Sequence, residues 1–557
     1  MTFKIKIIFF SVSLLFALAA GIYASFYSQK YYSFIEYGPD PLDGLMRNER
    51  AYFNVEKDGR CSAFIQEFKE NNRSFLCIAP LIIFAPEVLR RHDAHLFITI
   101  PYIFLFLYLL CYLIWMRSKN IFHAICVAFL YITCYAISEP YFGIGFNMPD
   151  MIAGYPLAIA ALSLLIWNER RKTLWIVLFS AFLSIAVLTR FIFSVYAFLL
   201  FSGPLTYFFL LQYRSSKITW KEIAKTCLLC MVIIAVLCGY YILSHFNTNM
   251  EYYSYWLNSK KGTMNISILQ SGERFLFMYA GFLRKIHASF LILLFIINIY
   301  FFEIDSKIFR QRIFIFLWMF LVIPFYWVVI LKTNGHVVGS AFIAAFPLMF
   351  MCLAIPINNI ILEKRKKIFS YLLVVIIVAS IIDFSFTVNK NDKLLTTEII
   401  KPVQRKLLAV HLSEWFNTIT PRDCTLSLII FSSGYIAEDI SLESFYKHGK
   451  YIRTLKSGNK FSVFNNYYNY EDPKTDIEVI KNDLFEKAVS TSNLLIFNSD
   501  ISNTDSTIFN APISRQVERA LFERFSLERS WKKTPIPDSS FKNLILFYRD
   551  YLEFSNN

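Results

Sequence analysis

Charged residues are scarce in this chain of 557 residues: Asp, Glu, Lys and Arg make up 17%, against 56% hydrophobic residues. Soluble domains carry about 25% charged residues, so this composition, with a mean hydropathy of +0.45, excludes an ordinary soluble protein. The chain also lacks a GxGxxG segment, a P-loop and a GxSxG elbow. These absences leave an integral membrane protein that works without the common nucleotide-binding and hydrolase motifs.

The apolar residues gather into stretches close to the ~20 residues that cross a ~30 Å hydrocarbon core. We predict about eleven membrane spans, at 5–26, 96–116, 120–138, 151–167, 173–189, 191–213, 226–244, 287–302, 313–331, 338–360 and 368–384. Residues 75–86 are too short and too rich in proline to span, so we expect an interfacial or re-entrant helix there.

The chain has a net charge of +15, and the distribution of its basic residues indicates how the chain is oriented in the membrane. Basic residues cluster at alternate ends of the predicted spans, at Lys4–Lys6, Arg117–Lys119, Arg170–Lys172, Arg214–Lys225, Lys307–Arg312 and Lys364–Lys367. This positive-inside pattern predicts a cytoplasmic N-terminus, and an odd number of spans then places everything after about residue 385 on the outer face. We expect membrane lipids as partners and no nucleic acid.

The N-terminal segment has an alternative interpretation as a cleaved signal peptide, since residues 17–20 are small. The apolar run continues past them to Phe26, which favours a retained span. Cys61 and Cys77 both lie between the first two spans, in the predicted outer loop. The oxidising environment outside the cytoplasm would permit a disulfide between them.

Two domains are expected. Residues 1–387 form a transmembrane domain with a long first outer loop, 27–95, and residues 388–557 form a polar extracytoplasmic domain. This tail opens with a helical pattern over Leu394–Ile419. Apolar runs then alternate with helical patterns, which indicates an α/β layer structure. The expected strands lie at 425–431, 493–497 and 543–548, and the expected helices at 477–488 and 515–525.

Carboxylates follow the first span directly, at Glu36, Asp40 and Asp43. A carboxylate at the membrane surface could take the proton of an acceptor hydroxyl as that hydroxyl attacks the anomeric carbon of a sugar. The structural alternative is that Asp40 and Asp43 begin a helix near Pro41, since Asp-Pro is a common helix start. Two more acidic residues, Glu139 and Asp150, bracket the outer loop 140–149.

Cationic residues on the outer side could hold a departing lipid phosphate. Arg190 lies at the break between two spans, and Lys332 and His336 lie in the outer turn before the tenth span. Arginine suits this task because its guanidinium pairs with two phosphate oxygens. The alternatives are that Arg190 reaches to lipid headgroups and that His336 is an ordinary turn residue.

This layout resembles the GT-C superfamily of polyprenyl-phosphate-dependent glycosyltransferases. The long first outer loop with acidic residues after the first span is similar to that family's signature. The stretch Asn147–Ala158 resembles its segment with an Asp at the start of a span. Residues Trp167–Arg171 and Leu183–Phe193 resemble its basic inner loop and the span that follows, which ends in Lys or Arg. An outer α/β tail also occurs in several branches of the family.

The resemblance implies roles for individual residues. The catalytic carboxylate falls on Asp40, Asp43 or Glu36, with Asp40 preferred. The chain departs from the family here, because Asp40 and Asp43 are separated by two residues where an adjacent Asp-Glu or a spaced Asp-x-Asp is usual. The tail also lacks the Trp-Trp-Asp motif, which argues against an oligosaccharyltransferase.

Substrate-binding positions follow in the same way. Glu139 and Asp150 match acidic positions of the second outer loop, and Arg190 matches a basic position associated with the carrier phosphate. The sequence therefore predicts a membrane glycosyltransferase that moves a sugar from a polyprenyl-phosphate donor to a lipid, glycan or protein acceptor at the outer face. No cofactor is expected, and the need for a divalent cation stays open.

Three alternatives stay open at the level of the sequence. A glycan polymerase or ligase would act on similar lipid-linked substrates, but such proteins tend to use arginines and histidines of outer loops. A transporter or flippase of lipid-linked glycans would need polar residues midway through several spans. A non-enzymatic envelope protein would use the tail to bind a partner.

Overall fold

The computed structural model divides the chain into two compact units, Met1–Gly44 with Asn54–Leu395, and Leu45–Phe53 with Thr396–Asn557. In the first part of the chain the structure describes residues 3–31, 39–71, 74–134, 137, 143–145, 149–191, 193–214, 219–258, 287–302, 346–348, 350–356 and 365–398. In the tail it describes residues 409–416, 426–430, 445, 452–454, 482, 485–486, 489–490, 494–498, 512–535 and 544–549. The expected domain boundary at residue 387 stays a prediction.

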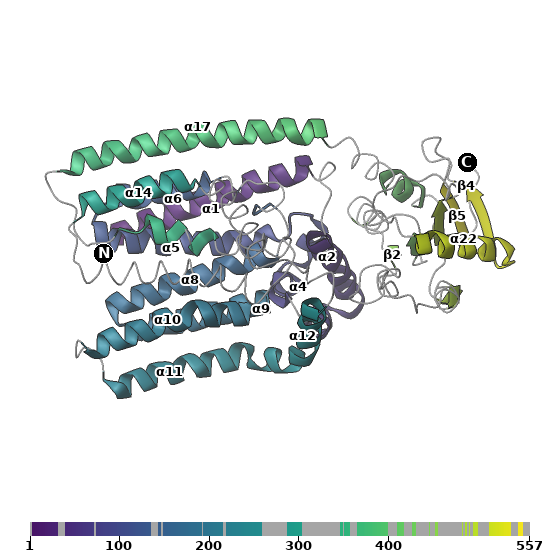
Figure 1. Ribbon diagram of the computed structural model, residues 1–557, viewed down its shortest axis with the longest axis horizontal. Helices are drawn as coiled ribbons and strands as arrows, with labels where there is room; N and C mark the ends of the chain where they lie inside the picture. The colour runs from purple at the N-terminus through teal and green to yellow at the C-terminus, as the bar shows by residue number, and fades with distance from the viewer. Residues whose placement is uncertain are drawn as a thin grey trace. The chain divides into compact units, whose positions relative to one another are not determined.

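Long apolar helices with roughly parallel axes build the first unit (Figure 1). They are α1 (Phe3–Tyr31), α5 (Leu96–Ser118), α6 (Ile121–Ile132), α8 (Pro149–Arg170), α9 (Thr173–Thr189), α10 (Phe193–Arg214), α11 (Trp220–Ile234), α14 (Ala288–Phe301) and α17 (Lys366–Glu398). Among the described residues, five helices are long and apolar enough to cross a membrane, and several shorter apolar helices accompany them. The expected count of eleven spans therefore stays a prediction.

The helices pack both with neighbours in the chain and with more distant ones, since α9 packs against α8 and also against α11. The hairpin of α8 and α9 is joined by two residues, Arg171 and Lys172, and α5 packs against α1, α6 and α8. Buried aromatic rings fill the interior, where the Tyr131 hydroxyl donates to the Tyr155 hydroxyl at 3.0 Å. Because a bilayer core holds no water to satisfy these two hydroxyls, each is the hydrogen-bond partner of the other inside the bundle.

The first loop, residues 27–95, is largely helical where it is described. It contains α2 (Pro39–Asp58), α3 (Arg60–Glu70), η1 (Phe75–Cys77), α4 (Ala79–Phe84) and η2 (Pro86–Arg90). The expected non-spanning helix at 75–86 corresponds to η1 and α4. Both are short because proline stands at residues 80 and 86 and cannot extend a preceding helix.

One expected span differs from the structure. Residues 226–244 lie within a helix that runs from α11 through a π-helical segment, η3 (Ala235–Gly239), into α12 (Tyr240–Asn258). The expected span 313–331 lies outside the described residues, as does most of the first half of the expected span 338–360.

The tail contains a five-stranded sheet with strand order β2-β1-β3-β5-β4. Its strands are β1 (Leu426–Ile430), β2 (Ile452–Thr454), β3 (Leu494–Asn498), β4 (Trp531–Pro535) and β5 (Leu544–Arg549). The first three are parallel, and β5 pairs antiparallel with β3 and β4. The helix α22 (Pro512–Leu527) packs Phe525 against Phe497 and Trp531, so an α/β layer is present as expected.

Candidate active site

The first loop and the end of α9 meet around Arg190. Arg190 follows the last residue of α9 in an extended conformation, and its N–H donates to the Ala186 carbonyl at 2.9 Å. The preceding carbonyl, of Thr189, accepts a weak hydrogen bond from the buried Cys77 thiol of η1 at 3.6 Å. The half-buried Arg190 is therefore bordered directly by a helix of the first loop.

An apolar cluster holds this junction together. Phe191, next to Arg190, packs with Phe75 of η1, Ala79 of α4 and Tyr241 of α12. The Tyr241 hydroxyl also donates to the carbonyl of Asn71, the residue after α3, at 2.9 Å. The structure thus brings the chain next to Arg190 against the helices of the first loop.

The predicted carboxylates lie near the N-termini of two helices. Asp40 and Asp43 both fall near the start of α2, so the expected helix start near Pro41 is present, and Asp150 is the second residue of α8. The positive end of a helix dipole stabilises an ionised carboxylate at such positions. Because α8 and α9 form a tight hairpin, Asp150 and Arg190 belong to the same end of the bundle.

Glu36, Glu139, Lys332 and His336 lie outside the described residues, and so do the side chains of Asp40, Asp43 and Asp150. Their roles stay predictions. Among the described residues, no group of three or more His, Cys, Asp and Glu side chains could hold a metal ion.

A buried carboxylate that sequence reasoning missed anchors the end of α1. Asp93 accepts two hydrogen bonds from the Arg91 guanidinium, at 2.8 and 2.9 Å, and a third from the Ser25 hydroxyl of α1. Burial would raise the pKa of Asp93, but the hydrogen bonds from Arg91 and Ser25 outweigh it and lower the pKa to about 2. The side chain is thus a fixed anion at the end of the first loop.

Two further contacts complete this anchor. The fully buried His95, which precedes α5, places Nε2 2.9 Å from the Ile144 carbonyl. A Cβ on Gly145 would lie 3.1 Å from the carbonyl oxygen of Ala24 in α1, so glycine permits the close approach there. We call Ser25, Arg91, Asp93, His95 and Ile144 the α1 anchor. A signal existed in the sequence, because residues 90–95 read Arg-Arg-His-Asp-Ala-His directly before an apolar span.

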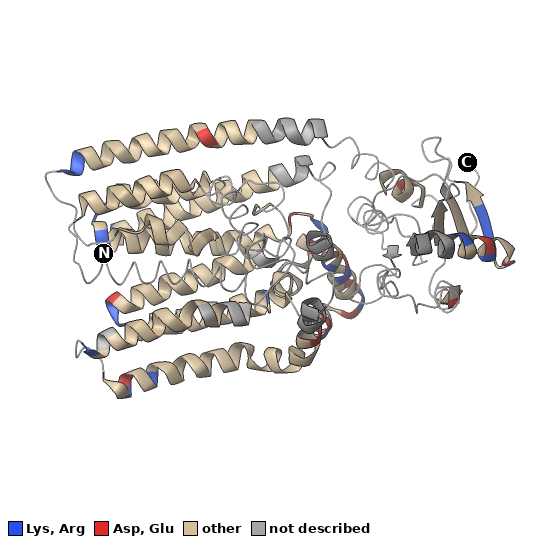
Figure 2. Cartoon of the chain, viewed as in Figure 1, with Lys and Arg blue, Asp and Glu red and all other residues tan. Residues whose placement is uncertain are grey.

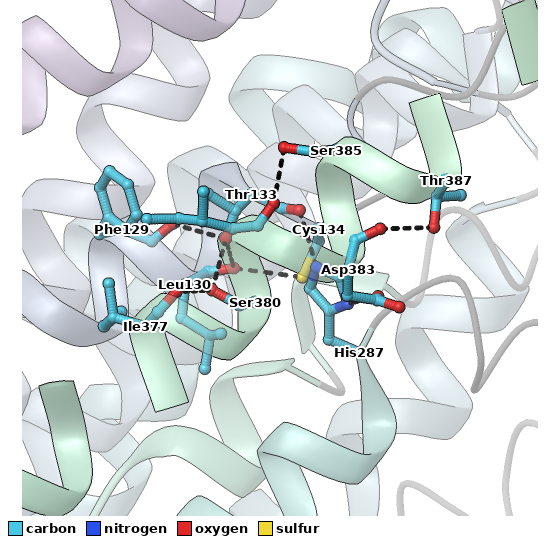
Figure 3. Close-up of polar contacts among 11 residues, drawn as sticks. Phe129, Leu130, Thr133, Cys134, His287, Ile377, Ser380, Asp383, Ser385 and Thr387 are labelled. Carbon is cyan, nitrogen blue, oxygen red and sulfur yellow. Dashed lines mark hydrogen bonds and ion pairs between the residues drawn. The ribbon is translucent and has the colours of Figure 1, made fainter. Parts of the chain in front are cut away.

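A second polar cluster joins α6, α14 and α17 (Figure 3). His287, which precedes α14, places Nδ1 2.9 Å from an Asp383 oxygen and Nε2 2.7 Å from the Thr133 carbonyl. Thr133 also contacts Ser380 of α17, with 3.4 Å between the hydroxyl oxygens. Since Asp383 lies within a candidate span, its carboxylate requires a partner, and His287 supplies it.

The cysteines differ from expectation. Cys61 is exposed on α3 and Cys77 is buried in η1, and neither is in a disulfide, so the predicted bond does not form in this structure. Cys227 and Cys230, which form a Cys-x-x-Cys sequence on α11, are in no disulfide either. None of these four cysteines is therefore part of a disulfide in the structure.

Charge is distributed unevenly along the bundle. Figure 2 shows Lys and Arg gathered where α8 and α10 end and where α11 and α17 begin. At the basic end, the buried Arg117 pairs with Glu169 of α8 and donates to the Pro356 carbonyl at 3.1 Å. Arg190 and the first loop thus lie at the end of the bundle that is poor in span-end cations.

No protein-family model matches this sequence, and no curated protein matches it either. Among solved structures, the chain is similar to ArnT from Cupriavidus metallidurans, crystallised with undecaprenyl phosphate. The identity is 9%, the TM-score is 0.52, and the match covers 96% of this chain and 97% of that one.

A second match is the oligosaccharyltransferase AglB from Archaeoglobus fulgidus, in complex with an inhibitory peptide and a dolichol-phosphate. The identity is 12%, the TM-score is 0.43, and the match covers 97% of this chain and 75% of that one. The match to ArnT covers both chains almost completely. The chain therefore shares its fold with ArnT, and the resemblance seen in the sequence is confirmed at the level of fold.

Proposed function

We propose that this protein is an integral-membrane glycosyltransferase that takes a sugar from a polyprenyl-phosphate donor and attaches it to a lipid, glycan or protein acceptor at the outer face of the membrane. The observation that carries the proposal is the GT-C fold, shared with ArnT over nearly the whole length of both chains. The distribution of Lys and Arg supports the orientation, because their gathering at one end of the spans is typical of a cytoplasmic face.

The reaction is a displacement at the anomeric carbon. The acceptor oxygen forms a bond to that carbon, and the bond from the carbon to the phosphate oxygen breaks. The hydroxyl proton passes to the base, which we assign to Asp40, with Asp43 or Glu36 as the alternative. A single displacement of this kind inverts the anomeric configuration.

The leaving group is the lipid phosphate, which gains negative charge as the bond breaks. We assign its stabilisation to Arg190, with Lys332 and His336 as further cations, because a guanidinium matches the phosphate oxygens. The position of Arg190 at the end of a span suits a lipid whose phosphate lies at the membrane surface. Glu139 and Asp150 are left to bind the sugar or the acceptor.

The first test is sugar transfer by the full-length protein in phospholipid vesicles that contain a polyprenyl-phosphate sugar. Asp40→Asn and Asp43→Asn are compared with Asp58→Asn, a control at the exposed far end of the same helix. Loss of the base should lower kcat by about 100-fold or more, while the control keeps the wild-type rate. Full transfer by both Asp40→Asn and Asp43→Asn would remove the assigned role.

The alternatives separate in the same vesicles. A transporter or flippase would move the donor lipid between leaflets without forming a glycosidic bond. A polymerase or ligase would form that bond but should depend on cationic residues, so Asp40→Asn and Asp43→Asn would both stay active while Arg190→Gln would not. The transferase proposal requires both the product and its dependence on a carboxylate.

A further inference from the structure

The continuous helix formed by α11, η3 and α12 is too long to lie within the membrane. Its three segments have 15, 5 and 19 residues. At 1.5 Å per residue, α11 and η3 together span roughly 30 Å, which is the thickness of the hydrocarbon core. The exposed Lys221 and Lys225 in the first turns of α11 belong at one headgroup level. Residues from Tyr240 onward therefore lie at or beyond the headgroup level on the opposite side of the membrane.

The helix changes direction at this level. The π-helical segment η3 interrupts the regular hydrogen-bond pattern, which is a common cause of helix kinks. Figure 1 shows α12 turning away from the line of α11 toward the helices of the first loop. Its partners there are loop residues, since His245 Nε2 lies 2.9 Å from the Phe68 carbonyl and Phe68 stacks on Tyr240.

Three faces divide the surface of α12. The face toward the protein carries the buried Tyr241, His245 and Asn249, at a spacing of four residues. A second face is apolar and exposed, with Leu243 at 78%, Phe246 at 47% and Met250 at 49% exposure. A third face is polar and exposed, with Asn247, Thr248 and Glu251. At 100° per residue, the centres of these faces are separated by roughly 120°.

The apolar face of α12 continues the membrane-facing surface of α11. On α11 and η3, the large exposed apolar residues are Trp220, Leu228, Met231, Val232, Val236 and Leu237. Between Val236 and Leu243 this face carries Gly239 and the exposed aromatic ring of Tyr240, and no charged side chain interrupts it. The apolar face of α12 is therefore in contact with the same medium as the exposed surface of α11, and that medium is lipid. The polar face of α12, in contrast, must be in contact with water or lipid headgroups.

We propose that α12 lies on the bilayer surface, with Leu243, Phe246 and Met250 inserted among the acyl chains and Thr248 and Glu251 directed to water. Its partner is a lipid surface, as for other interfacial amphipathic helices. Through Tyr241 the helix also belongs to the apolar cluster that contains Phe191, the neighbour of Arg190. The inference depends on membrane integration of the chain and is independent of the proposed reaction.

Photo-crosslinking in vesicles tests this placement. The full-length protein carries p-benzoylphenylalanine at Leu243, at Thr248 or, as the lipid-facing reference, at Val232, and is reconstituted in phosphatidylcholine with phosphatidylglycerol. All three positions are exposed, so the bulky side chain does not disturb the core. Lipid adducts are measured by mass spectrometry after irradiation. Position 243 should match position 232 within about twofold, and position 248 should give about tenfold less.

Each other result would overturn the proposal. Equal lipid adducts at 243 and 248 would mean that α12 is surrounded by acyl chains and extends the span. Adducts at 232 with none at 243 would mean that α12 stands clear of the membrane. Protein–protein crosslinks at 243 in place of lipid adducts would assign the apolar face to a second copy of the chain.

Discussion

Replacing Asp93 by Asn tests the α1 anchor. The folded protein holds the pKa of Asp93 at about 2, against 3.8 for the unconstrained side chain. At 1.36 kcal/mol per pKa unit, the folded state favours the ionised carboxylate by about 2.5 kcal/mol. Asn has the shape of the protonated acid but no charge, so Asp93→Asn should destabilise the first unit by about this amount at neutral pH.

The dependence on pH has a defined sign. Because the pKa of Asp93 is lower in the folded state than in the unfolded state, its contribution is complete above about pH 4 and is lost as the pH falls toward 2. Wild-type protein should therefore lose about 2.5 kcal/mol of unfolding free energy in this window that the Asp93→Asn variant does not lose. The two stabilities should converge near pH 2.

Denaturant unfolding in detergent micelles, followed by tryptophan fluorescence, measures the effect. The matched control is Glu87→Gln, which removes an exposed carboxylate from η2, a few residues away, and should change stability by less than about 0.5 kcal/mol. Unfolding of Asp93→Asn at the wild-type midpoint at pH 7 would contradict a stabilising role for the Asp93 carboxylate. A constant difference between the two proteins from pH 7 to pH 2 would refute the electrostatic account as well.

Two other substitutions probe packing within the bundle. A Cβ on Gly21 of α1 would overlap the end of the Ile100 side chain of α5, so Gly21→Ala should cost about 1–3 kcal/mol in thermal unfolding, whereas Ile22→Ala on the exposed face should cost less. His123 is fully buried between aromatic rings, and neither ring nitrogen has a hydrogen-bond partner among the described residues. His123→Phe should therefore raise stability by about 1 kcal/mol, and a lower melting temperature would contradict this.

Features that depend on local sequence were predictable. The expected span 173–189 coincides with α9, because a continuous apolar run is bounded by Lys172 and by Arg190. The tail strands at 426–430, 494–498 and 544–549 also fall within a residue or two of their expected positions. Each is a short apolar run between polar segments, so the local pattern was sufficient.

Features that depend on distant partners were not predictable. Ser25 and Asp93 are 68 residues apart, and no periodicity links them. The pairing of His287 with Asp383 likewise requires the packing of α14 against α17, which a single sequence does not reveal. The order of the tail strands, with β5 inserted between β3 and β4, depends on long-range pairing in the same way.

The hairpin of α8 and α9 has a consequence for biosynthesis. Its turn carries three adjacent cations, Arg170, Arg171 and Lys172, and in the proposed orientation these stay in the cytoplasm. Moving one positive charge outward costs about 2.3 kcal/mol per 100 mV of membrane potential. At a potential of about 100 mV, translocating all three would therefore cost about 7 kcal/mol. The hairpin should therefore insert as one piece with its turn retained. Retention of this turn during synthesis then delivers Asp150 and Arg190 to the opposite face together.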